Sequence, residues 1–172
     1  IDACLVGSEM CIRDSTSGSG KTTVTLGLLR AMGRAGIGVN AAKSGPDYID
    51  AAFLAAASGA SAVNLDSHAM RRDLIRHLAA DRPEPRLLVE GVMGLFDGTD
   101  GGSGSTVSVA EALQAPVMLV LDARHQGQTA GALAAGIATQ LPDGVSLAGV
   151  ALNRIASSRL SLIHISEPTR QA

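Results

Sequence analysis

The sequence predicts an α/β domain in which helices cover both faces of a parallel β-sheet. Short apolar runs alternate with amphipathic stretches along most of the chain, a pattern typical of βαβ units. Residues 116–122 form a continuous apolar run, as expected of a strand covered on both faces. The composition is 46% hydrophobic but only 2% aromatic. An Ala-rich core with so few aromatic residues favours helices packed on a sheet over a β-sandwich.

The first half of the chain supplies alternating helices and strands. Residues 20–35 carry Val24, Leu28 and Met32 at helical spacing, and Gly36 can follow the end of that helix. A short strand is expected at 37–42 and a short helix at 51–57. Ser67 is predicted to cap a helix that runs to about residue 80.

The second half repeats the alternation. A strand at 86–90 is followed by a Gly-rich loop, and Ser108 with Glu111 resembles a capping box that opens the next helix. The strand at 116–122, a helix at 128–141 and a second buried strand at 147–153 complete the pattern. Right-handed crossovers would place the carboxyl ends of all strands at one edge, where ligands bind.

The two ends of the chain differ in composition from the middle. Residues 1–15 contain Cys4 and Cys11 and show no helical or strand period, and residues 160–172 are equally unlike the rest. Both stretches resemble translated sequencing-adapter DNA, so they are predicted to be artefacts that flank a domain at 16–159. A core strand belongs directly before this domain, and we expect residues 10–13 to occupy it with Arg13 facing the core.

The segment SGSGKTT, directly before the first predicted helix, is the sharpest motif. A P-loop needs glycines so that its backbone can wrap around phosphate, with N–H groups and a helix N-terminus facing the anion. Lys21 would reach the β- and γ-phosphates of ATP, and the Thr22 hydroxyl would bind Mg²⁺. Ser15 stands where the usual pattern has its first glycine. The residues expected to bind the phosphates are Ser17, Gly18, Ser19, Gly20, Lys21, Thr22 and Thr23.

Two further clusters follow predicted strands. KSGPDYID places Lys43, Asp47 and Asp50 on a turn after the second strand, where a carboxylate could bind Mg²⁺ or simply cap a helix. EGVMGLFDG begins with Glu90 at a strand end and also contains Asp97. Acidic strand ends together with a P-loop predict a phosphoryl-transfer site.

These motifs resemble the cobyrinic acid a,c-diamide synthase family. SGSGKTTVTLGLLR, KSGPDYID, SAVNLD, LLVEGVMGLFDG, APVMLVLDAR and GVALNRIAS match in unbroken order over about residues 16–159. The resemblance implies a P-loop NTPase-like, dethiobiotin-synthetase-like fold and an ATP-dependent amide ligase of cobalamin biosynthesis. In that family ATP phosphorylates the a and c carboxylates of the corrin ring, and ammonia then displaces phosphate. In the family the ammonia comes from glutamine, through a C-terminal glutamine amidotransferase domain, which we expect to be missing from this chain.

The resemblance also implies a role for each matched residue. Thr22, Asp47 and Glu90 would bind Mg²⁺, and Lys21 and Lys43 would stabilise the transferring phosphoryl group. Asp50 and Asp97 would orient the carboxylate, the metal or ammonia. Asn153 and Arg154 follow the last strand, where such enzymes contact adenine, although Asn153 could simply end the strand. Residues 98–104 could form a lid over the intermediate or a plain surface loop.

Other classes of protein remain as alternatives. Cobyric acid synthase and dethiobiotin synthetase share the chemistry, a partition-type regulatory ATPase shares the P-loop, and an inactive fragment is the fourth alternative. A net charge of −2 argues against nucleic acid as a partner. No apolar run reaches the length of a membrane span, so a cytoplasmic protein is expected. The expected partners are the corrin macrocycle and a glutaminase domain; the resemblance leaves a homodimer open.

Overall fold

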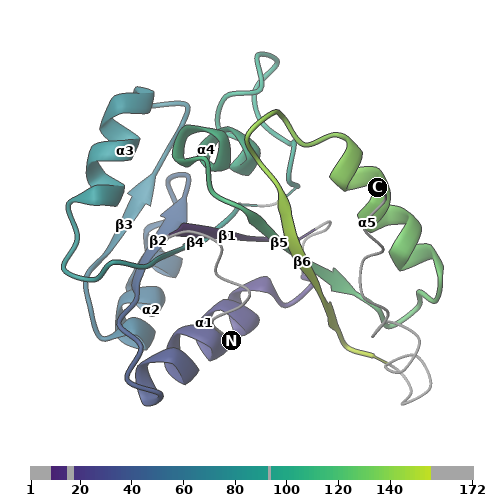
Figure 1. The fold of residues 1–172 in the computed structure, drawn as a ribbon, viewed down its shortest axis with the longest axis horizontal. Coiled ribbons are helices and arrows are strands. Elements are labelled where there is room, and N and C mark those ends of the chain that lie inside the picture. Colours follow the sequence, from purple (N-terminus) through teal and green to yellow (C-terminus); the bar gives the residue numbers. More distant parts are fainter. Residues whose placement is uncertain (1–8, 15–17, 93, 156–172) are drawn as a thin grey trace.

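A computed structural model describes residues 9–14, 18–92 and 94–155. Six parallel strands form one sheet in the order β3-β2-β4-β1-β5-β6 (Figure 1). The fold class is confirmed as a P-loop NTPase-like α/β sheet. The strands are β1 Glu9–Asp14, β2 Asn40–Ser44, β3 Ala62–Leu65, β4 Leu87–Glu90, β5 Val117–Asp122 and β6 Leu147–Asn153. The helices are α1 Lys21–Arg34, α2 Tyr48–Ser58, α3 Arg72–Ala80, α4 Thr106–Leu113 and α5 Thr129–Thr139.

The helices cover both faces of the sheet. Helices α1 and α2 pack on the face that presents Ile12 and Leu88, and α3 and α4 pack on the face that presents Cys11 and Val89. Helix α5 covers β5 on the side of α3 and α4, through Leu119 and its neighbours. Successive strand residues point to opposite faces, so each inner strand contributes to both cores. The core is built from Ala, Val, Leu, Ile and Met, as the composition predicts.

Strand β1 occupies the centre of the sheet, between β4 and β5. It pairs with Leu87–Glu90 on one side and Val117–Val120 on the other. The expectation that residues 10–13 fill this position is confirmed, and Arg13 is fully buried there. Its Nη1 donates a 2.5 Å hydrogen bond to Oγ1 of Thr106, at the start of α4. A guanidinium thus lies on the central strand, where apolar side chains normally pack.

Strand β2 covers Asn40–Ser44 rather than 37–42, and three helix starts also lie several residues from their predicted positions. Helix α2 begins at Tyr48 rather than residue 51, because the Asp47 carboxylate caps it three residues earlier. Helix α3 begins at Arg72, so the prediction that Ser67 caps it was wrong; the Ser67 hydroxyl instead lies 2.5 Å from that of Ser108. Helix α4 begins at Thr106 with Ser105 as its cap, so Ser108 lies inside the first turn rather than before it.

The strands at the two edges of the sheet also differ from expectation. Strand β3 was not predicted, because four residues carry too little pattern to distinguish a strand from a loop. Strand β6 was expected to be buried but is half-buried along its length, because it pairs on one side only. In the described ranges no helix is long and apolar enough to cross a membrane.

Candidate functional site

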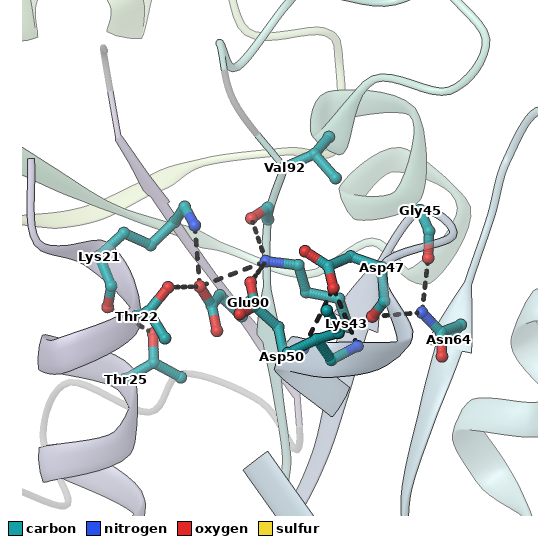
Figure 2. Close-up of polar contacts among 12 residues, drawn as sticks. Lys21, Thr22, Thr25, Lys43, Gly45, Asp47, Asp50, Asn64, Glu90 and Val92 are labelled. Atoms are coloured by element: carbon teal, nitrogen blue, oxygen red, sulfur yellow. Dashed lines mark hydrogen bonds and ion pairs between the residues drawn. The ribbon is translucent and has the colours of Figure 1, made fainter. Parts of the chain in front are cut away.

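The candidate residues gather where three adjacent strands end. Strands β2, β4 and β1 are neighbours in the sheet, and all run in the same direction. Lys21 and Thr22, the first residues of α1, contact Glu90, so the amino end of that helix lies at the same edge as Lys43 and Glu90. Figure 2 shows the side chains of Lys21, Lys43 and Glu90, from α1, β2 and β4, pointing toward one another.

The P-loop turn ends in a helix whose amino terminus has no side-chain cap. Gly18 and Gly20 have φ of 77° and 89°, values in the left-handed region that favour glycine. Gly20 is the residue before α1, and this cap position supplies no side-chain hydrogen bond to the first turn of the helix. The positive end of the helix is therefore arranged for an anion. Of the predicted P-loop residues, Ser17 lies outside the described residues, and Thr23 is exposed on the first turn of α1.

Lys21 and Thr22 converge on a single buried carboxylate oxygen. Nζ of Lys21 lies 2.8 Å from Oε1 of Glu90, and Oγ1 of Thr22 lies 2.5 Å from the same atom. Glu90 is the last residue of β4 and is fully buried. The predicted association of the P-loop with the acidic end of this strand is therefore present in the structure.

Lys43 joins the same carboxylate from the other side. Its Nζ lies 3.3 Å from Oε1 of Glu90 and 2.6 Å from Oδ2 of Asp50, and it points toward the carbonyl oxygen of Gly91 at 3.4 Å. Burial on its own lowers the pKa of Lys43, but the hydrogen bond to Asp50 and the nearby carboxylates outweigh burial and raise it. Lys43 is therefore a buried ammonium that stays charged at neutral pH.

Asp47 serves first as a helix cap. Its Oδ1 accepts from the N–H groups of Ile49 and Asp50, at 3.0 and 3.1 Å. These backbone hydrogen bonds hold the pKa of Asp47 below its usual value. Asn64, which no sequence argument singled out, donates to the carbonyl oxygens of Gly45 and Asp47 and so fixes this turn. Its only signal in the sequence was its place within the SAVNLD motif.

Asp97 is not brought into this cluster. It is exposed, and its backbone N–H donates to the carbonyl oxygen of Gly94 in a turn of its own. A Cβ atom placed on Gly94 would meet the Asp97 carboxylate, so that carboxylate lies back over its own turn. The role expected for Asp97 stays a prediction.

Asn153 and Arg154 reach the P-loop itself. Nδ2 of Asn153 donates to the carbonyl oxygen of Ser19 at 2.7 Å, and Nη1 of Arg154 donates to that of Gly18 at 2.5 Å. Arg154 also pairs with Asp122, the last residue of β5, at 2.9 Å. Asp122 was not among the expected site residues, although it ends an apolar strand as Glu90 does.

The site offers oxygen atoms suited to a hard cation. Oε2 of Glu90 is buried and has no hydrogen-bond partner among the described residues, while Oγ1 of Thr22 lies beside Oε1. Carboxylate and hydroxyl oxygens are the ligands Mg²⁺ prefers. The described ranges hold no group of three His, Cys, Asp or Glu side chains that could bind a metal alone. A metal here would share its coordination with phosphate oxygens, and Asp47 contacts neither Thr22 nor Glu90 in the interactions described.

Several large apolar side chains are exposed on α2 and on the loop after β4. Tyr48, Ile49 and Phe53 of α2 are 76%, 72% and 58% exposed, and Phe96 in the loop after β4 is 40% exposed. Tyr48, Phe53 and Phe96 are all the aromatic residues of the chain. Aromatic residues normally dominate a protein core, so the exposed Tyr48 and Phe53 on α2, the helix that Asp47 caps, mark a candidate contact surface.

Comparison with known proteins places the chain among relatives of greater length. Hydrogenobyrinate a,c-diamide synthase from Mesorhizobium japonicum is 51% identical over 148 residues, which are 83% of this chain and 34% of that protein. The enzyme of the same name from Rhodobacter capsulatus is 48% identical over 155 residues, 87% of this chain and 35% of that protein. The chain thus spans about a third of the length of the curated relatives it matches.

A solved structure and a family model extend the comparison. Chloroplast FtsY from Physcomitrella patens shares the fold, with a TM-score of 0.55 at 20% identity over 85% of this chain and 49% of that chain. A family model described as "CobQ/CobB/MinD/ParA nucleotide binding domain" matches residues 11–170. With its P-loop turn, buried lysines and acidic strand end, this chain belongs to the CobQ/CobB/MinD/ParA nucleotide-binding domain family.

Proposed function

We propose that this domain binds Mg·ATP and activates side-chain carboxylates of a corrin ring for amidation. The single observation that carries the proposal is the convergence of Lys21 and Lys43 on one buried oxygen of Glu90. Two ammonium groups at the mouth of a P-loop, one from the start of α1 and one from β2, suit a transferring phosphoryl group flanked by donor and acceptor. The curated relatives, named hydrogenobyrinate a,c-diamide synthases, direct the choice of substrate toward hydrogenobyrinate or cobyrinate.

The proposed chemistry has two steps. A carboxylate oxygen of the substrate attacks the γ-phosphorus, the bond from that phosphorus to the β–γ bridging oxygen breaks, and ADP leaves with an acyl phosphate formed. Ammonia then attacks the acyl carbon, phosphate leaves with the carboxylate-derived oxygen, and a proton is released to solvent. Repetition at a second carboxylate gives the a,c-diamide.

Each residue of the cluster has a role in this scheme. Lys21 would bind the β- and γ-phosphates, and Lys43 would meet the γ-phosphoryl group from the substrate side. Asp50 would hold Lys43 in place through their 2.6 Å ion pair. Thr22 and Glu90 would hold Mg²⁺, which when bound neutralises charge on the phosphate oxygens. Asp47, together with Asp97 from outside the cluster, would act on the substrate side, as orienting carboxylates.

The exposed apolar surface is suited to the rest of the substrate. We assign Tyr48, Ile49 and Phe53 to contact with the macrocycle, since a broad, partly apolar ring can cover side chains that water would otherwise contact. Helix α2 also carries Asp50, so ring and phosphate sites would share one element. Ammonia would come from a glutaminase domain of the same protein, and a cytoplasmic location follows from the need for ATP.

An isotope experiment tests the acyl phosphate directly. The chain is incubated with Mg·ATP, ammonium and hydrogenobyrinate labelled with ¹⁸O in its carboxylates. Transfer of one ¹⁸O into each phosphate released supports the proposal, and unlabelled phosphate refutes it. Lys43→Met should abolish the transfer, while Arg34→Met, at the far end of α1, should leave it unchanged.

A further inference from the structure

The P-loop is held from outside by two side chains more than 130 residues away along the chain. Asn153 ends β6 and donates to the carbonyl oxygen of Ser19, and Arg154 follows it and donates to the carbonyl oxygen of Gly18. The contact with Asn153 is close, because a Cβ atom on Gly20 would fall 2.3 Å from its Nδ2. The carboxyl end of β6 is thereby attached to the phosphate-binding turn.

Arg154 is held in a specialised conformation. Its φ is 58°, in the left-handed region that non-glycine residues rarely adopt, and its N–H donates to Oδ1 of Asn153 at 2.9 Å. Nη1 also lies 2.9 Å from Oδ2 of Asp122. Hydrogen bonds from Arg124, and then from Arg154, hold the pKa of Asp122 well below its usual value. Backbone strain of this kind persists where surrounding contacts fix it, often at functional sites.

The two contacts determine how the peptide groups of the turn are oriented. No described peptide bond is cis, and in a trans peptide the C=O and N–H bonds point in opposite directions. With the carbonyl groups of Gly18 and Ser19 directed at Arg154 and Asn153, the N–H groups of Ser19 and Gly20 point away from those side chains. A phosphate-binding turn needs its N–H groups directed at the anion.

We propose that Arg154 and Asn153, with Asp122 as the anchor of Arg154, are positioning residues that preset the P-loop to receive polyphosphate. This differs from the adenine contact that the family resemblance implies for the same two residues. The proposal rests on the nucleotide-binding part of the proposed function and is independent of amide formation.

Calorimetric titration with two probes separates these roles. Mg·ATP contains adenine and Mg·tripolyphosphate does not, so a positioning residue affects both and an adenine contact affects only the first. We expect Arg154→Ala to weaken both by the same factor, roughly tenfold for the loss of an exposed charge-assisted hydrogen bond. Arg154→Lys, which keeps a donor and the charge, should recover part of the affinity for both probes.

Arg124 provides the matched control. It pairs with the same Asp122 carboxylate at 2.7 Å but makes no described contact with the P-loop. Arg124→Ala should therefore leave both affinities within about twofold of the unmodified chain. Asp122→Asn should weaken both probes, and combining it with Arg154→Ala should cost less than the sum of the single losses, because the two residues act as one unit.

Specific outcomes would overturn the proposal. If Arg154→Ala weakens only the binding of Mg·ATP, Arg154 contacts adenine. If the affinity losses add in the double variant, Asp122 does not act through Arg154. Failure of the unmodified chain to bind either probe would also refute it. Thermal unfolding of each variant checks the fold, and if Arg154→Ala does not fold, the same comparison is made on Arg154→Lys and Asp122→Asn. Absence of ¹⁸O transfer with normal probe binding would refute the ligase function alone.

Discussion

Replacing Glu90 by Gln removes the carboxylate on which two buried lysines converge. Lys21 lies 2.8 Å and Lys43 3.3 Å from Oε1, and the side chains of Glu90, Lys21 and Lys43 are 0%, 10% and 3% exposed. Gln keeps the shape but removes the negative charge and can turn N–H donors toward two ammonium groups. The variant therefore leaves two buried positive charges close together, with Asp50 as the described carboxylate still paired with Lys43.

The expected cost is large for a single substitution. Breaking a buried ion pair by removing one partner costs about 3–5 kcal/mol, because the remaining charge stays buried without compensation. For a domain of this size, 3 kcal/mol corresponds to a fall in Tm of roughly 6–12 °C. Asp50 retains part of the stabilisation of Lys43, so we expect the lower end of the range, about 3 kcal/mol.

Urea unfolding followed by circular dichroism measures this difference. The matched control is Glu111→Gln, which breaks the ion pair with Arg72 at the same 2.8 Å distance but on the surface. An exposed pair contributes about 0–1 kcal/mol. Metal-free tripolyphosphate should also stabilise Glu90→Gln more than the unmodified chain, since its oxygens offer the lysines a replacement anion.

Two results would refute this reasoning. One is a loss below about 1 kcal/mol in Glu90→Gln, or a loss equal to that of Glu111→Gln, which would mean that the buried lysines are solvated or neutral. The other is equal stabilisation of both chains by tripolyphosphate, which would separate the stability effect from the anion site.

Three further predictions concern the turn, the core and a helix cap. Gly20→Ala should abolish Mg·ATP binding in calorimetry, because φ is 89° and the added Cβ would meet a side-chain amide, whereas Gly27→Ala, with open space inside α1, should bind normally. Burial raises the pKa of the Cys11 thiol to about 12, from 9. In a Cys4→Ser chain, the Cys11 thiol should therefore resist alkylation at pH 8, and rapid alkylation of the folded chain would contradict this. The free energy of unfolding should also fall as pH rises from 9 toward 12, because the thiol ionises in the unfolded chain before it ionises in the folded one. Asp47→Ala should lower the free energy of unfolding in urea by about 1 kcal/mol, whereas Asp47→Asn keeps the helix cap; an equal loss in both variants would exclude capping. Because the pKa of Asp47 is lowered in the folded chain, the stability difference between the unmodified chain and Asp47→Ala should be present at neutral pH and shrink in acid.

The inner part of the fold was predictable because its signals are local. The strands that end in Glu90 and Asp122 are apolar runs with two buried faces, and α1 carries its own periodicity. The edges of the sheet were less predictable. Strand β3 is too short to show alternation, and the half-burial of β6 depends on having one neighbour, which is a property of the sheet and not of its residues.

The candidate site divides in the same way. The sequence identifies Lys21, Lys43 and Glu90 because each follows a glycine-rich turn or ends a strand, and parallel topology then brings them together. It could not show that Arg154 reaches the carbonyl group of Gly18, since that contact depends on backbone conformations 136 residues apart in sequence. The capping error at Ser108 arose because the nearby Ser105 competes for the same helix end, and the error at Ser67 arose because α3 begins only at Arg72, without a side-chain cap.

The position of the aromatic residues determines what intrinsic fluorescence can measure in this protein. The chain has no Trp and one Tyr, and that Tyr48 is exposed on α2 rather than packed in the core. Its ultraviolet emission is therefore nearly the same in the folded and unfolded chain and is a poor measure of folding. Tyr48 does belong to the proposed ring surface, where a bound coloured macrocycle would quench its emission. A tyrosine whose emission barely changes on denaturation can thus serve as an intrinsic optical probe of substrate binding.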